Sequence, residues 1–511
     1  MKIGLAQIDA HLGDLEGNVE RCLAAIDRAR SLGADLVVLP ELTLPGGPPR
    51  DMLLDSSFVE SLGAAADDLA WRARSGPPVI VGSAVPAAVP AAPGHPGLLD
   101  AALLLEGGTR RVVAAKRHLP CRDVSFDPRW FVPGGAAAPV VIAGVAVGVL
   151  VNEDLEDAEH AAYPPGALRD AGAELLVVIA ASHYRKGVLE RRLRHARRAG
   201  CPVAFVNATG AVDELVFDGR SFVLDGRGEE LARLAAFADA VRVVDLEAPA
   251  GPRTADPPLE EELFRALVLG VREFARKNRI GHAFVGVSGG VDSALVAVIA
   301  AEALGPEHVT AIAIPSRYTD PRSTSSAREL AAGLGIGFEV VDLEPLHAAA
   351  ETGLAGVIDG GTTAENVQAR LRMVVLMAFV NSRGGMLLNT SNKTELTLGY
   401  STLYGDTAGT LCPIADLTKP EVYALARWIA GRRAVIPPFI LERPPSAELR
   451  PGQVDPFDYD VVAPAVDTLV QHDRSDVAMR RSEHKRRQFG VVLKVSERSF
   501  GSGRLVPITR R

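Results

Sequence analysis

The chain has 511 residues, of which 47% are hydrophobic and 23% charged, and its formal net charge is −8, from 55 basic and 63 acidic side chains. This length exceeds what one hydrophobic core usually supports, so we expect two domains. The bulk charge favours neither nucleic acid nor a membrane surface as a partner. The longest apolar stretch, 136–151, is interrupted by one proline and two glycines, which predicts two short strands joined at a glycine and not a membrane-spanning helix.

The first residues, "MKIGLAQIDA", alternate like a strand and lack the charged start and long apolar core of a signal peptide. We therefore expect a cytoplasmic protein. The four cysteines, Cys22, Cys121, Cys201 and Cys412, are widely separated and form no CxxC pair. This spacing favours neither a disulfide framework nor a zinc site.

Strands alternate with helices from Met1 to about Leu246. The strands include "DLVVLP", "PPVIVGSAV", "ELLVVIAAS" and "PVAFVNATG", and 17–32 is a predicted helix. Glu41 follows one strand, Lys116 follows the strand in "VVAAKRHLP", and Asn152 ends the apolar run in "VGVLVNEDLED". Strand ends often carry reactive side chains, but an amide is a poor nucleophile.

A proline-rich segment, "EAPAGPRTADPPLEEEL", separates this half from the rest. It predicts a first domain over 1–246, a linker over 247–258 and a second domain over 259–511. In the second domain a helix over 259–277 precedes the strand of "HAFVGVSGGVDSALVAVIAAEAL", a glycine turn, a long helix and the strand "VTAIAIPS". This order predicts a doubly wound parallel sheet with ligand chemistry at the carboxyl ends of its strands.

The turn "SGGVDS" has the features of a phosphate-binding loop. Glycines allow close backbone approach, and amides at a helix N-terminus attract an anion. The candidate ligands are Ser288, Gly289, Gly290, Asp292 and Ser293, and Asp292 adds a carboxylate suited to magnesium. The alternative is a serine-rich turn that only caps the helix.

This loop resembles the pyrophosphate-binding loop of the ATP pyrophosphatase superfamily. Further motifs follow it in order: "ENVQARLRM", "LLNTSNKTELTLGYSTLYGD", "PIADLTKPEVYALARW", "IPPFILERPPSAELRPGQVDPFDYDVV" and "EHKRRQF". Together they resemble the synthetase domain of the glutamine-dependent NAD synthetase family over nearly all of 259–511.

The resemblance implies that ATP and deamido-NAD are substrates, and that the nicotinate carboxylate becomes an adenylate that ammonia attacks. It implies ATP contacts at the loop and at Arg317, Thr390 and Thr402, and magnesium at Asp292 and Glu395. The implied deamido-NAD ligands are Asn366, Arg370, Arg372, Asn392, Lys393 and Lys485. Cations suit such anionic substrates, although Arg370, Arg372 and the run "MRRSEHKRRQ" could instead be solvated surface charges.

The N-terminal half resembles the nitrilase superfamily, which implies an α-β-β-α sandwich. In that superfamily a glutamate takes the thiol proton, a lysine stabilises the oxyanion and a cysteine attacks the amide. Glu41 and Lys116 match the first two, but the family's "CED" segment reads "NED" here, with Asn152 in the nucleophile's place. A covalent glutamyl intermediate cannot form on a carboxamide.

Three explanations of Asn152 compete: an engineered change, natural loss of the site, or recruitment of Cys121, five residues after Lys116. Other departures favour natural loss. "SFDPRWFVPG" lacks the second active-site glutamate of the usual "FDEERYFVPG", "SHYRKGV" replaces a usual "SPY" with a following "GK", and the aromatic expected after "CED" is missing from "NEDLEDAEH". The first domain is then a pseudo-glutaminase.

The sequence thus favours an NAD synthetase that uses free ammonia, and the resemblance implies a homo-oligomer because the family's synthetase domains pair. The alternatives are a paralogous ATP-dependent ligase for another carboxylate or amine, a glutamine-dependent enzyme with an engineered residue 152, and a non-catalytic dinucleotide-binding regulator. The presence of both magnesium carboxylates argues against the regulator.

Overall fold

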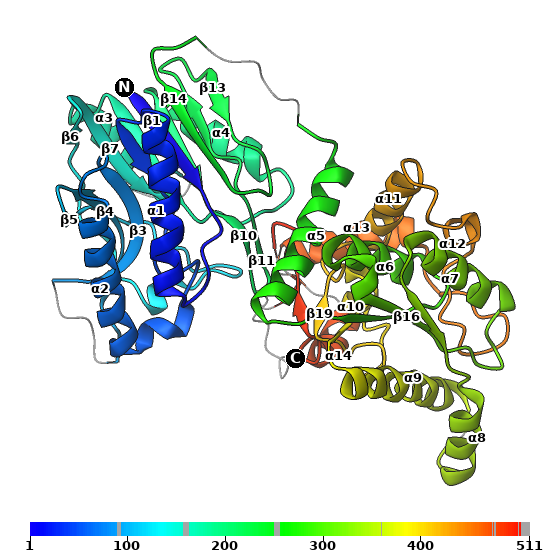
Figure 1. Cartoon of the computed structure of the whole chain (residues 1–511). Coiled ribbons are helices and arrows are strands. Elements are labelled where there is room, and N and C mark those ends of the chain that lie inside the picture. Colours follow the sequence, from blue (N-terminus) through cyan, green and yellow to red (C-terminus); the bar gives the residue numbers. More distant parts are fainter. Residues whose placement is uncertain are drawn as a thin grey trace. The chain divides into compact units, whose positions relative to one another are not determined.

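The chain forms two compact units, Met1–Asp256 and Pro257–Arg511 (Figure 1). This computed structural model describes residues 1–88, 94–156, 163–249, 256–358, 360–472, 474, 477–498 and 500–501. Half of the predicted linker, residues 250–255, and the segment 157–162 after "NEDLE" therefore lie outside the described residues. Among the described residues, no helix combines the length and apolar character needed to cross a membrane.

Unit 1 contains two six-stranded sheets and a short hairpin. The first sheet has the order β14 (Ala240–Asp245), β1 (Lys2–Gln7), β2 (Leu36–Val38), β3 (Val79–Pro86), β4 (Leu98–Glu106) and β5 (Thr109–Ala115). The second has the order β13 (Glu230–Arg233), β12 (Phe222–Leu224), β9 (Val203–Asn207), β8 (Leu175–Ala180), β7 (Val145–Val151) and β6 (Val140–Ile142). The hairpin is β10 (Thr209–Val212) with β11 (Leu215–Asp218).

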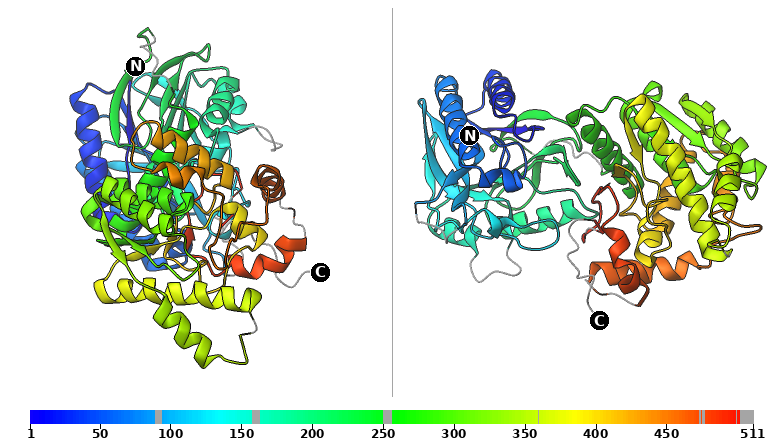
Figure 2. Two further views of the ribbon diagram at one scale, coloured as in Figure 1. Left: turned by 90° about the vertical axis from the view of Figure 1, so that its right-hand side faces the viewer. Right: turned by 90° about the horizontal axis from the view of Figure 1, so that it is seen from below.

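The two sheets pack face to face with helices outside them (Figures 1 and 2). One apolar core joins residues of β1, β2 and β3 to residues of β7, β8 and β9. Helices α1 (Leu15–Ser31) and α2 (Ser56–Arg72) cover the other face of the first sheet, and α3 (Pro164–Asp170) and α4 (Val188–Arg198) cover that of the second. The predicted α-β-β-α sandwich is confirmed.

Short helical turns follow several strands of unit 1, namely η1 (Arg50–Leu54), η2 (Asp127–Arg129) and η3 (Asn152–Leu155). The last begins directly at the end of β7. The apolar stretch 136–151 forms the antiparallel strands β6 and β7, which turn at Gly144 with a φ of +82°. Two strands joined at a glycine were predicted there, because a proline and glycines interrupt the run.

Unit 2 contains one parallel sheet in the order β17 (Gly337–Val340), β16 (Val309–Ala313), β15 (Ala283–Gly286), β18 (Met386–Leu388), β19 (Leu411–Cys412) and β20 (Val491–Val492). The chain runs from β15 to β17 in one direction and from β18 to β20 in the other. The point where the order reverses lies between β15 and β18, and ligands bind at such points in doubly wound sheets. The predicted doubly wound sheet is confirmed.

The helices of unit 2 begin with α5 (Leu259–Lys277), at the bounds predicted from the sequence. The others are α6 (Val291–Leu304), α7 (Pro321–Leu334), α8 (Glu344–Gly353), α9 (Gly361–Arg383), α10 (Lys393–Leu398), α11 (Lys419–Ala430), α12 (Pro438–Glu442), α13 (Tyr459–Gln471) and α14 (Val477–Arg486), with a short turn η4 (Pro306–His308). Helix α6 is almost entirely buried, because it is apolar on every side.

Candidate active site

The loop 288–293 joins β15 to α6 where the strand order reverses. Gly289 has a φ of +73°, and a Cβ there would lie 2.6 Å from the carbonyl oxygen of Ser323, so other residue types do not fit. The Ser288 backbone N–H donates to the Ser293 hydroxyl, which donates to the Gly290 carbonyl at 3.0 Å. The loop folds over the N-terminus of α6, where backbone N–H groups favour an anion.

A cavity of about 280 Å³ opens beside this loop. Its wall includes the carboxyl ends of β15, β16 and β18, one face of α9 and the segment 443–449. The volume is near the lower end of the range of small-molecule sites, about 300–1,000 Å³. Seven of the predicted ligands line the cavity: Ser288, Gly290, Asp292, Ser293, Arg372, Thr390 and Glu395.

Lys419 joins the two predicted metal ligands. Its Nζ lies 2.5 Å from Oδ2 of Asp292 and 3.1 Å from Oε1 of Glu395. Burial, with the charge of Asp292 adding to it, raises the pKa of Glu395 to about 7 although Lys419 opposes this. Burial alone lowers the pKa of Lys419, but the two carboxylates raise it above its usual value. With all three groups ionised, one negative charge remains at the cavity wall.

Asn392 fixes the first turn of α10 toward this group. Its side-chain oxygen accepts from the Glu395 backbone N–H at 3.1 Å, and Oε2 of Glu395 accepts from the Asn392 backbone N–H at 3.3 Å. This reciprocal cap orients the helix start. The Nδ2 of Asn392 also donates to Oδ1 of Asp292 at 2.9 Å. The amide therefore ties α10 to the phosphate-loop carboxylate.

Arg372 contributes a positive charge to the opposite part of the cavity wall. It lies on α9, and its Nε donates to the carbonyl of Ile314 at 3.2 Å. Burial lowers the pKa of Arg372 to about 10, so the side chain is still a cation at neutral pH. A planar guanidinium at this place suits a carboxylate or phosphate.

Unit 1 contains a second lysine surrounded by carboxylates. The Nζ of Lys116 lies 2.9 Å from Oε1 of Glu41, 2.8 Å from Oδ2 of Asp127 and 2.6 Å from Oε2 of Glu153, with Asp100 at 3.8 Å. The lysine side chain is 4% exposed. An ammonium group has three N–H donors. Two of the three short contacts are hydrogen bonds, to Glu41 and Asp127, and the contact with Glu153 is an ion pair without hydrogen-bond geometry.

The carboxylates around Lys116 carry more negative charge than the lysine balances. Burial raises the pKa of Glu153 to about 7, and burial with the charge of Glu41 raises the pKa of Asp100 well above its usual range. Burial also raises the pKa of Asp127, although Lys116 opposes this. Burial alone lowers the pKa of Lys116, but the carboxylates raise it well above its usual value. The group therefore retains protons near neutral pH.

Asp127 supplies a carboxylate that the sequence comparison did not predict. The segment "SFDPRWFVPG" lacks the family's second glutamate, and we expected the site to have lost that acid. The structure corrects this expectation, because the Asp127 carboxylate contacts Lys116 directly. The η2 turn, which begins at Asp127, places this carboxylate against the lysine.

Asn152 stands at the end of β7 with a φ of +41°, in the left-handed region that asparagine tolerates better than most residues. The next residue, Glu153, contacts Lys116, so Asn152 lies beside the carboxylate group. Asp154 then accepts backbone N–H groups of Arg117 and His118 at 2.9 and 2.8 Å. These bonds fix the turn after β7 against the segment that carries Lys116.

The space beside Glu41 is small. The pocket lined by Glu41, Thr43 and Thr209 has a volume of about 10 Å³, which is enough for one water molecule. Oε2 of Glu41 accepts from the Ala181 backbone N–H at 2.6 Å. The alternative thiol, Cys121, is exposed, whereas Glu41 is 3% exposed. With both oxygens of Glu41 engaged, the geometry does not favour it as a base for Cys121.

The comparisons with known proteins cover both units. Residues 2–251 match the carbon-nitrogen hydrolase family, and residues 263–499 match the NAD synthase family. A glutamine-dependent NAD(+) synthetase from Synechocystis sp. is 37% identical over 99% of this chain and 98% of its own. The one from Rhodobacter capsulatus is 38% identical over 100% and 98%. The chain belongs to the glutamine-dependent NAD(+) synthetase family.

A solved structure agrees with this assignment. The glutamine-dependent NAD+ synthetase from Acinetobacter baumannii, in complex with adenosine diphosphate, has a TM-score of 0.81, 26% sequence identity and coverage of 99% of this chain and 98% of its own. The predicted family and the class of C–N bond-forming ligases are confirmed.

Three of the NAD synthetase residues predicted to bind ligand are engaged elsewhere and do not line the cavity. Arg317 forms ion pairs with Glu344 and Glu351 of α8. Arg370 is exposed, and its Nε donates to the Leu403 carbonyl at 3.1 Å. Lys393 is fully buried. Their roles as ligands stay predictions.

Three more of the predicted ligands, Thr402, Asn366 and Lys485, do not line the cavity but contact segments beside it. The hydroxyl of Thr402 donates to Oδ1 of Asn366 at 2.7 Å, which links α9 to the segment after α10. Lys485 of α14 donates to the carbonyls of Gly399 and Ser401 at 2.8 and 2.5 Å. Thr402, Asn366 and Lys485 therefore brace the NAD synthetase motif "LGYSTLYGD", whose Tyr400 and Asp406 do line the cavity.

Sequence reasoning missed Lys419, the residue that joins Asp292 to Glu395. It lies at the first position of α11, which begins with the cap Thr418 and Glu421. The letters "TKPE" signal such a helix start, and a lysine there, at the positive end of a helix, needs nearby carboxylates. Asp455 was missed as well; it accepts from Tyr400 and Tyr459 at 3.2 and 2.9 Å at the cavity wall.

Proposed function

We propose that this chain makes NAD from deamido-NAD and ATP with free ammonia, and that its N-terminal unit is a silent glutaminase. The observation that carries the second part is the asparagine in the nucleophile's place, beside a Lys116 that is enclosed by Glu41, Asp127 and Glu153. Lys116 already donates to Glu41 and Asp127 and pairs with Glu153, and these carboxylates compete with an oxyanion for its N–H groups. Without a thiol, a glutamyl intermediate cannot form.

The second unit keeps the groups that adenylation needs. In the proposed reaction an oxygen of the nicotinate carboxylate attacks the α-phosphorus of ATP, the bond to the β-phosphate breaks and pyrophosphate leaves. Ammonia then attacks the acyl carbon, the bond to AMP breaks and the nitrogen loses a proton. Lys419 and the N-terminus of α6 would bind the anionic phosphates. Arg372 would bind an anionic group of either substrate.

Asp292 and Glu395 fit a magnesium ion. They line one cavity, and both contact Lys419. Among the described residues, no group of three or more His, Cys, Asp or Glu side chains could hold a metal. Magnesium bound with nucleotides usually takes one or two carboxylates and completes its shell with phosphates and water. The ion would neutralise phosphate charge, with ATP supplying the missing ligands.

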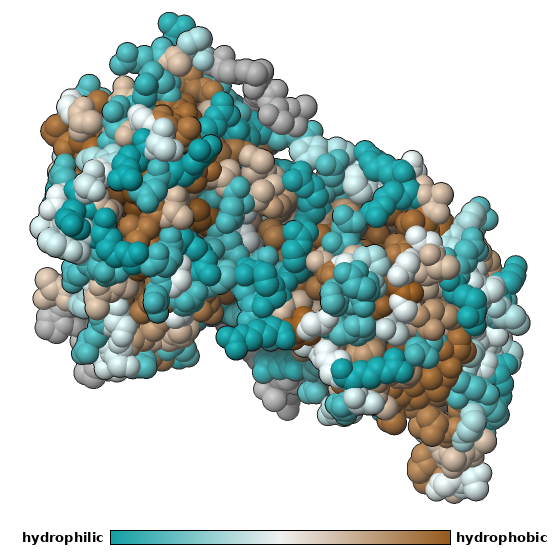
Figure 3. All heavy atoms as spheres, viewed as in Figure 1, coloured by the Kyte–Doolittle hydropathy of each residue, from teal (hydrophilic) through white to brown (hydrophobic). Residues whose placement is uncertain are grey.

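The homo-oligomer stays a proposal, and an exposed apolar surface on unit 2 supports it. Hydrophobic side chains gather where α8 and α9 lie (Figure 3). Val357 is 68% exposed and Val374 of α9 is 60% exposed. Exposed apolar patches of this kind often mark protein contacts.

The deciding experiment compares nitrogen donors with the full chain, deamido-NAD, ATP and magnesium. We expect ammonium to support NAD formation and glutamine to support none, and glutamine alone to release no glutamate. Equal rates with both donors would contradict the silent glutaminase. Pyrophosphate release only with a different carboxylate would show a paralogous ligase, and no release with any acceptor would show a regulator.

A further inference from the structure

Unit 2 contains a group of buried charges away from the cavity, built around Lys393 and Asp416. Both side chains are fully buried. The Nζ of Lys393 lies 3.2 Å from Oδ1 of Asp416, 2.8 Å from Oδ1 of Asp467 and 3.2 Å from the hydroxyl of Ser496. Lys393 donates hydrogen bonds to Asp467 and Ser496, and its contact with Asp416 is an ion pair. The charge of Lys393 is therefore enclosed by the chain and is not presented to a substrate.

The position of Lys393 in the chain connects it to the cavity. It is the first residue of α10, between the cap Asn392 and Glu395. Asn392 and Glu395 contact Asp292 and Lys419, whereas the side chain of Lys393 contacts the buried group. In this one helical turn, Asn392 and Glu395 contact residues of the cavity wall, and Lys393 contacts the buried group.

Asp416, the partner of Lys393, also lies close in sequence to a residue of the cavity wall. Asp416 precedes Lys419 by three residues. Between them, the Lys393 backbone N–H donates to the Leu417 carbonyl at 2.8 Å, and the Lys419 backbone N–H donates to the Thr394 hydroxyl at 3.2 Å. The Lys393–Asp416 ion pair therefore joins the segment that carries Glu395 to the segment that carries Lys419.

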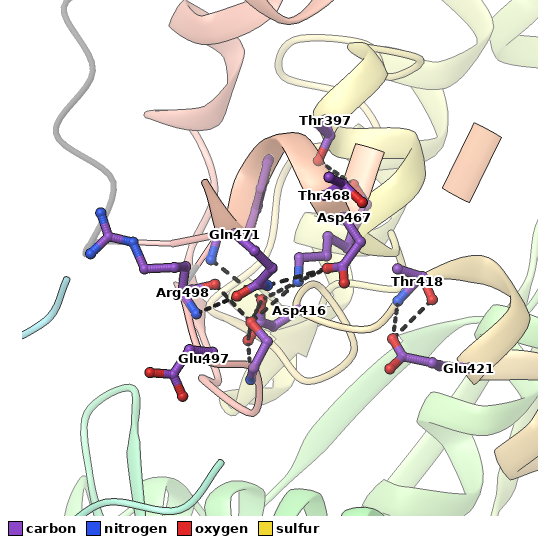
Figure 4. Close-up of polar contacts among 12 residues, drawn as sticks. Thr397, Asp416, Thr418, Glu421, Asp467, Thr468, Gln471, Glu497 and Arg498 are labelled. Atoms are coloured by element: carbon purple, nitrogen blue, oxygen red, sulfur yellow. Dashed lines mark hydrogen bonds and ion pairs between the residues drawn. The ribbon is translucent and has the colours of Figure 1, made fainter. Parts of the chain in front are cut away.

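The C-terminal segment that contains Val495 and Ser496 also contacts this buried group. Asp416 accepts the backbone N–H groups of Val495 and Ser496 at 2.9 and 2.7 Å and also the Ser496 hydroxyl. Beside it, the Arg498 backbone N–H donates to the side-chain oxygen of Gln471 on α13 (Figure 4). Three separate parts of the chain meet at one buried carboxylate, whose pKa stays below its usual value because Lys393 and Lys494 outweigh its burial.

We propose that Lys393 is a positioning residue, which through Asp416 holds Glu395 and Lys419 at the spacing that the ligase reaction needs, and is not a ligand of deamido-NAD. This inference rests on the proposed function for its kinetic test. It differs from the expectation of the sequence analysis, in which the lysine of the "TSNKTE" motif contacts deamido-NAD. A buried ion pair can fix one arrangement of segments even where it adds little net stability.

The test replaces Lys393 with methionine, which keeps the length of the side chain but removes the charge. With ammonium as donor and active sites counted by ATP binding, K393M should lower kcat at least 50-fold and leave the KM for deamido-NAD within threefold. A ligand role predicts the reverse, a KM raised tenfold or more with kcat retained. That outcome would overturn the proposal.

A second readout does not depend on turnover. The dissociation constant of ATP is measured by calorimetry with magnesium and with EDTA. In K393M the tightening that magnesium gives the wild-type chain should be lost, while metal-free ATP binds within threefold of wild type. If wild type makes no NAD, the proposed function fails and this arm alone decides the role of Lys393; an unchanged magnesium effect would then reject it.

Two further variants separate positioning from general destabilisation. Asp467→Asn changes the partly exposed partner of Lys393, whose side chain is 32% exposed, and should lower kcat about fivefold at unchanged KM. Glu273→Gln is the matched control, since Glu273 is a buried carboxylate of α5 that pairs with Arg276 and Lys277 and does not line the cavity. It should lower the Tm without changing kcat or the magnesium effect.

The outcomes remain decisive if K393M fails to fold. D467N then carries the test, and wild-type kcat and magnesium dependence in D467N would refute the proposal. The proposal also fails if E273Q reproduces the kinetic loss at an equal loss of Tm, because the effect would then be structural only.

Discussion

Each unit of this chain has a buried lysine held by carboxylates, but the two lysines have different surroundings. Lys419 contacts two carboxylates and lines a cavity of about 280 Å³. Lys116 has four carboxylates within 4 Å, and it does not line the pocket of about 10 Å³ beside its partner Glu41. A lysine can act on a substrate only if there is space in front of it. Residue type alone does not distinguish these two cases.

Removal of the cavity lysine should have the largest effect. Lys419→Met leaves Asp292 and Glu395 without the cation between them and removes a positive charge from the phosphate site. We expect kcat/KM for ammonium-dependent amidation to fall about 100- to 1,000-fold, as on loss of one well-placed donor to a transition state. Steady-state kinetics with saturating ammonium measure this. The control change in unit 1, Glu41→Gln, should leave the rate of ammonium-dependent amidation within about twofold. A comparable loss of rate in Glu41→Gln would contradict the difference between the two units.

Removal of the other lysine should affect stability instead. Lys116→Met leaves buried carboxylates without their cation, and breaking such a group typically costs about 3 to 5 kcal/mol. Hydrogen exchange of peptides from β4 and β7, followed in urea, measures the free energy of unfolding of unit 1. A conservative Lys116→Arg keeps the charge and should lose less. Unchanged exchange in Lys116→Met would mean that the carboxylates do not depend on the lysine.

The stability of unit 1 should depend on pH through Glu153. Its pKa rises from 4.5 to about 7 on burial, so the folded chain holds a proton that the unfolded chain releases. The free energy of unfolding should therefore fall as pH rises from 4.5 to 7, by up to about 1.4 kcal/mol per pH unit. Urea unfolding of unit 1 at several pH values measures the slope. Glu153→Gln removes the titrating group and should flatten it; the same slope in that variant would assign it to other acids.

The smallest effect is expected from restoring the thiol. Asn152→Cys returns the family nucleophile, but Lys116 stays paired with Glu41, Asp127 and Glu153. We expect no glutamate release from glutamine above the wild-type background. The double variant Asn152→Cys/Glu153→Gln also removes one carboxylate charge beside Lys116 and is the sharper comparison. Efficient hydrolysis by the single variant would mean that only residue 152 had been lost.

The sequence was sufficient to predict the two-unit α/β architecture, because strand and helix periods and the "SGGVDS" turn are local signals. It also identified Asp292 and Glu395, which the fold brings together at one lysine. It did not identify that lysine, because Lys419 lies 127 residues from Asp292 and only the sheet order brings them together.

The sequence also did not predict the direction in which individual side chains point. In the short helix α10, two residues that lie two positions apart in one motif face different surroundings: Glu395 lines the cavity and Lys393 lies in the interior. The sequence motif alone does not distinguish these two environments. In unit 1, the sequence showed that a glutamate is missing from the loop but could not show that the Asp127 carboxylate contacts Lys116.

The left-handed backbone at Asn152 restricts which mutations this position can accept. At a φ of +41° a β-branched or bulky side chain is strained, whereas asparagine, aspartate and glycine are tolerated. The turn also positions Glu153 and Asp154, which hold Lys116 and the segment after it. Selection for folding therefore acts at residue 152 whether or not unit 1 hydrolyses glutamine. Among descendants of this chain, substitutions at 152 should be drawn from that small set and not from the whole range open to an unused surface position.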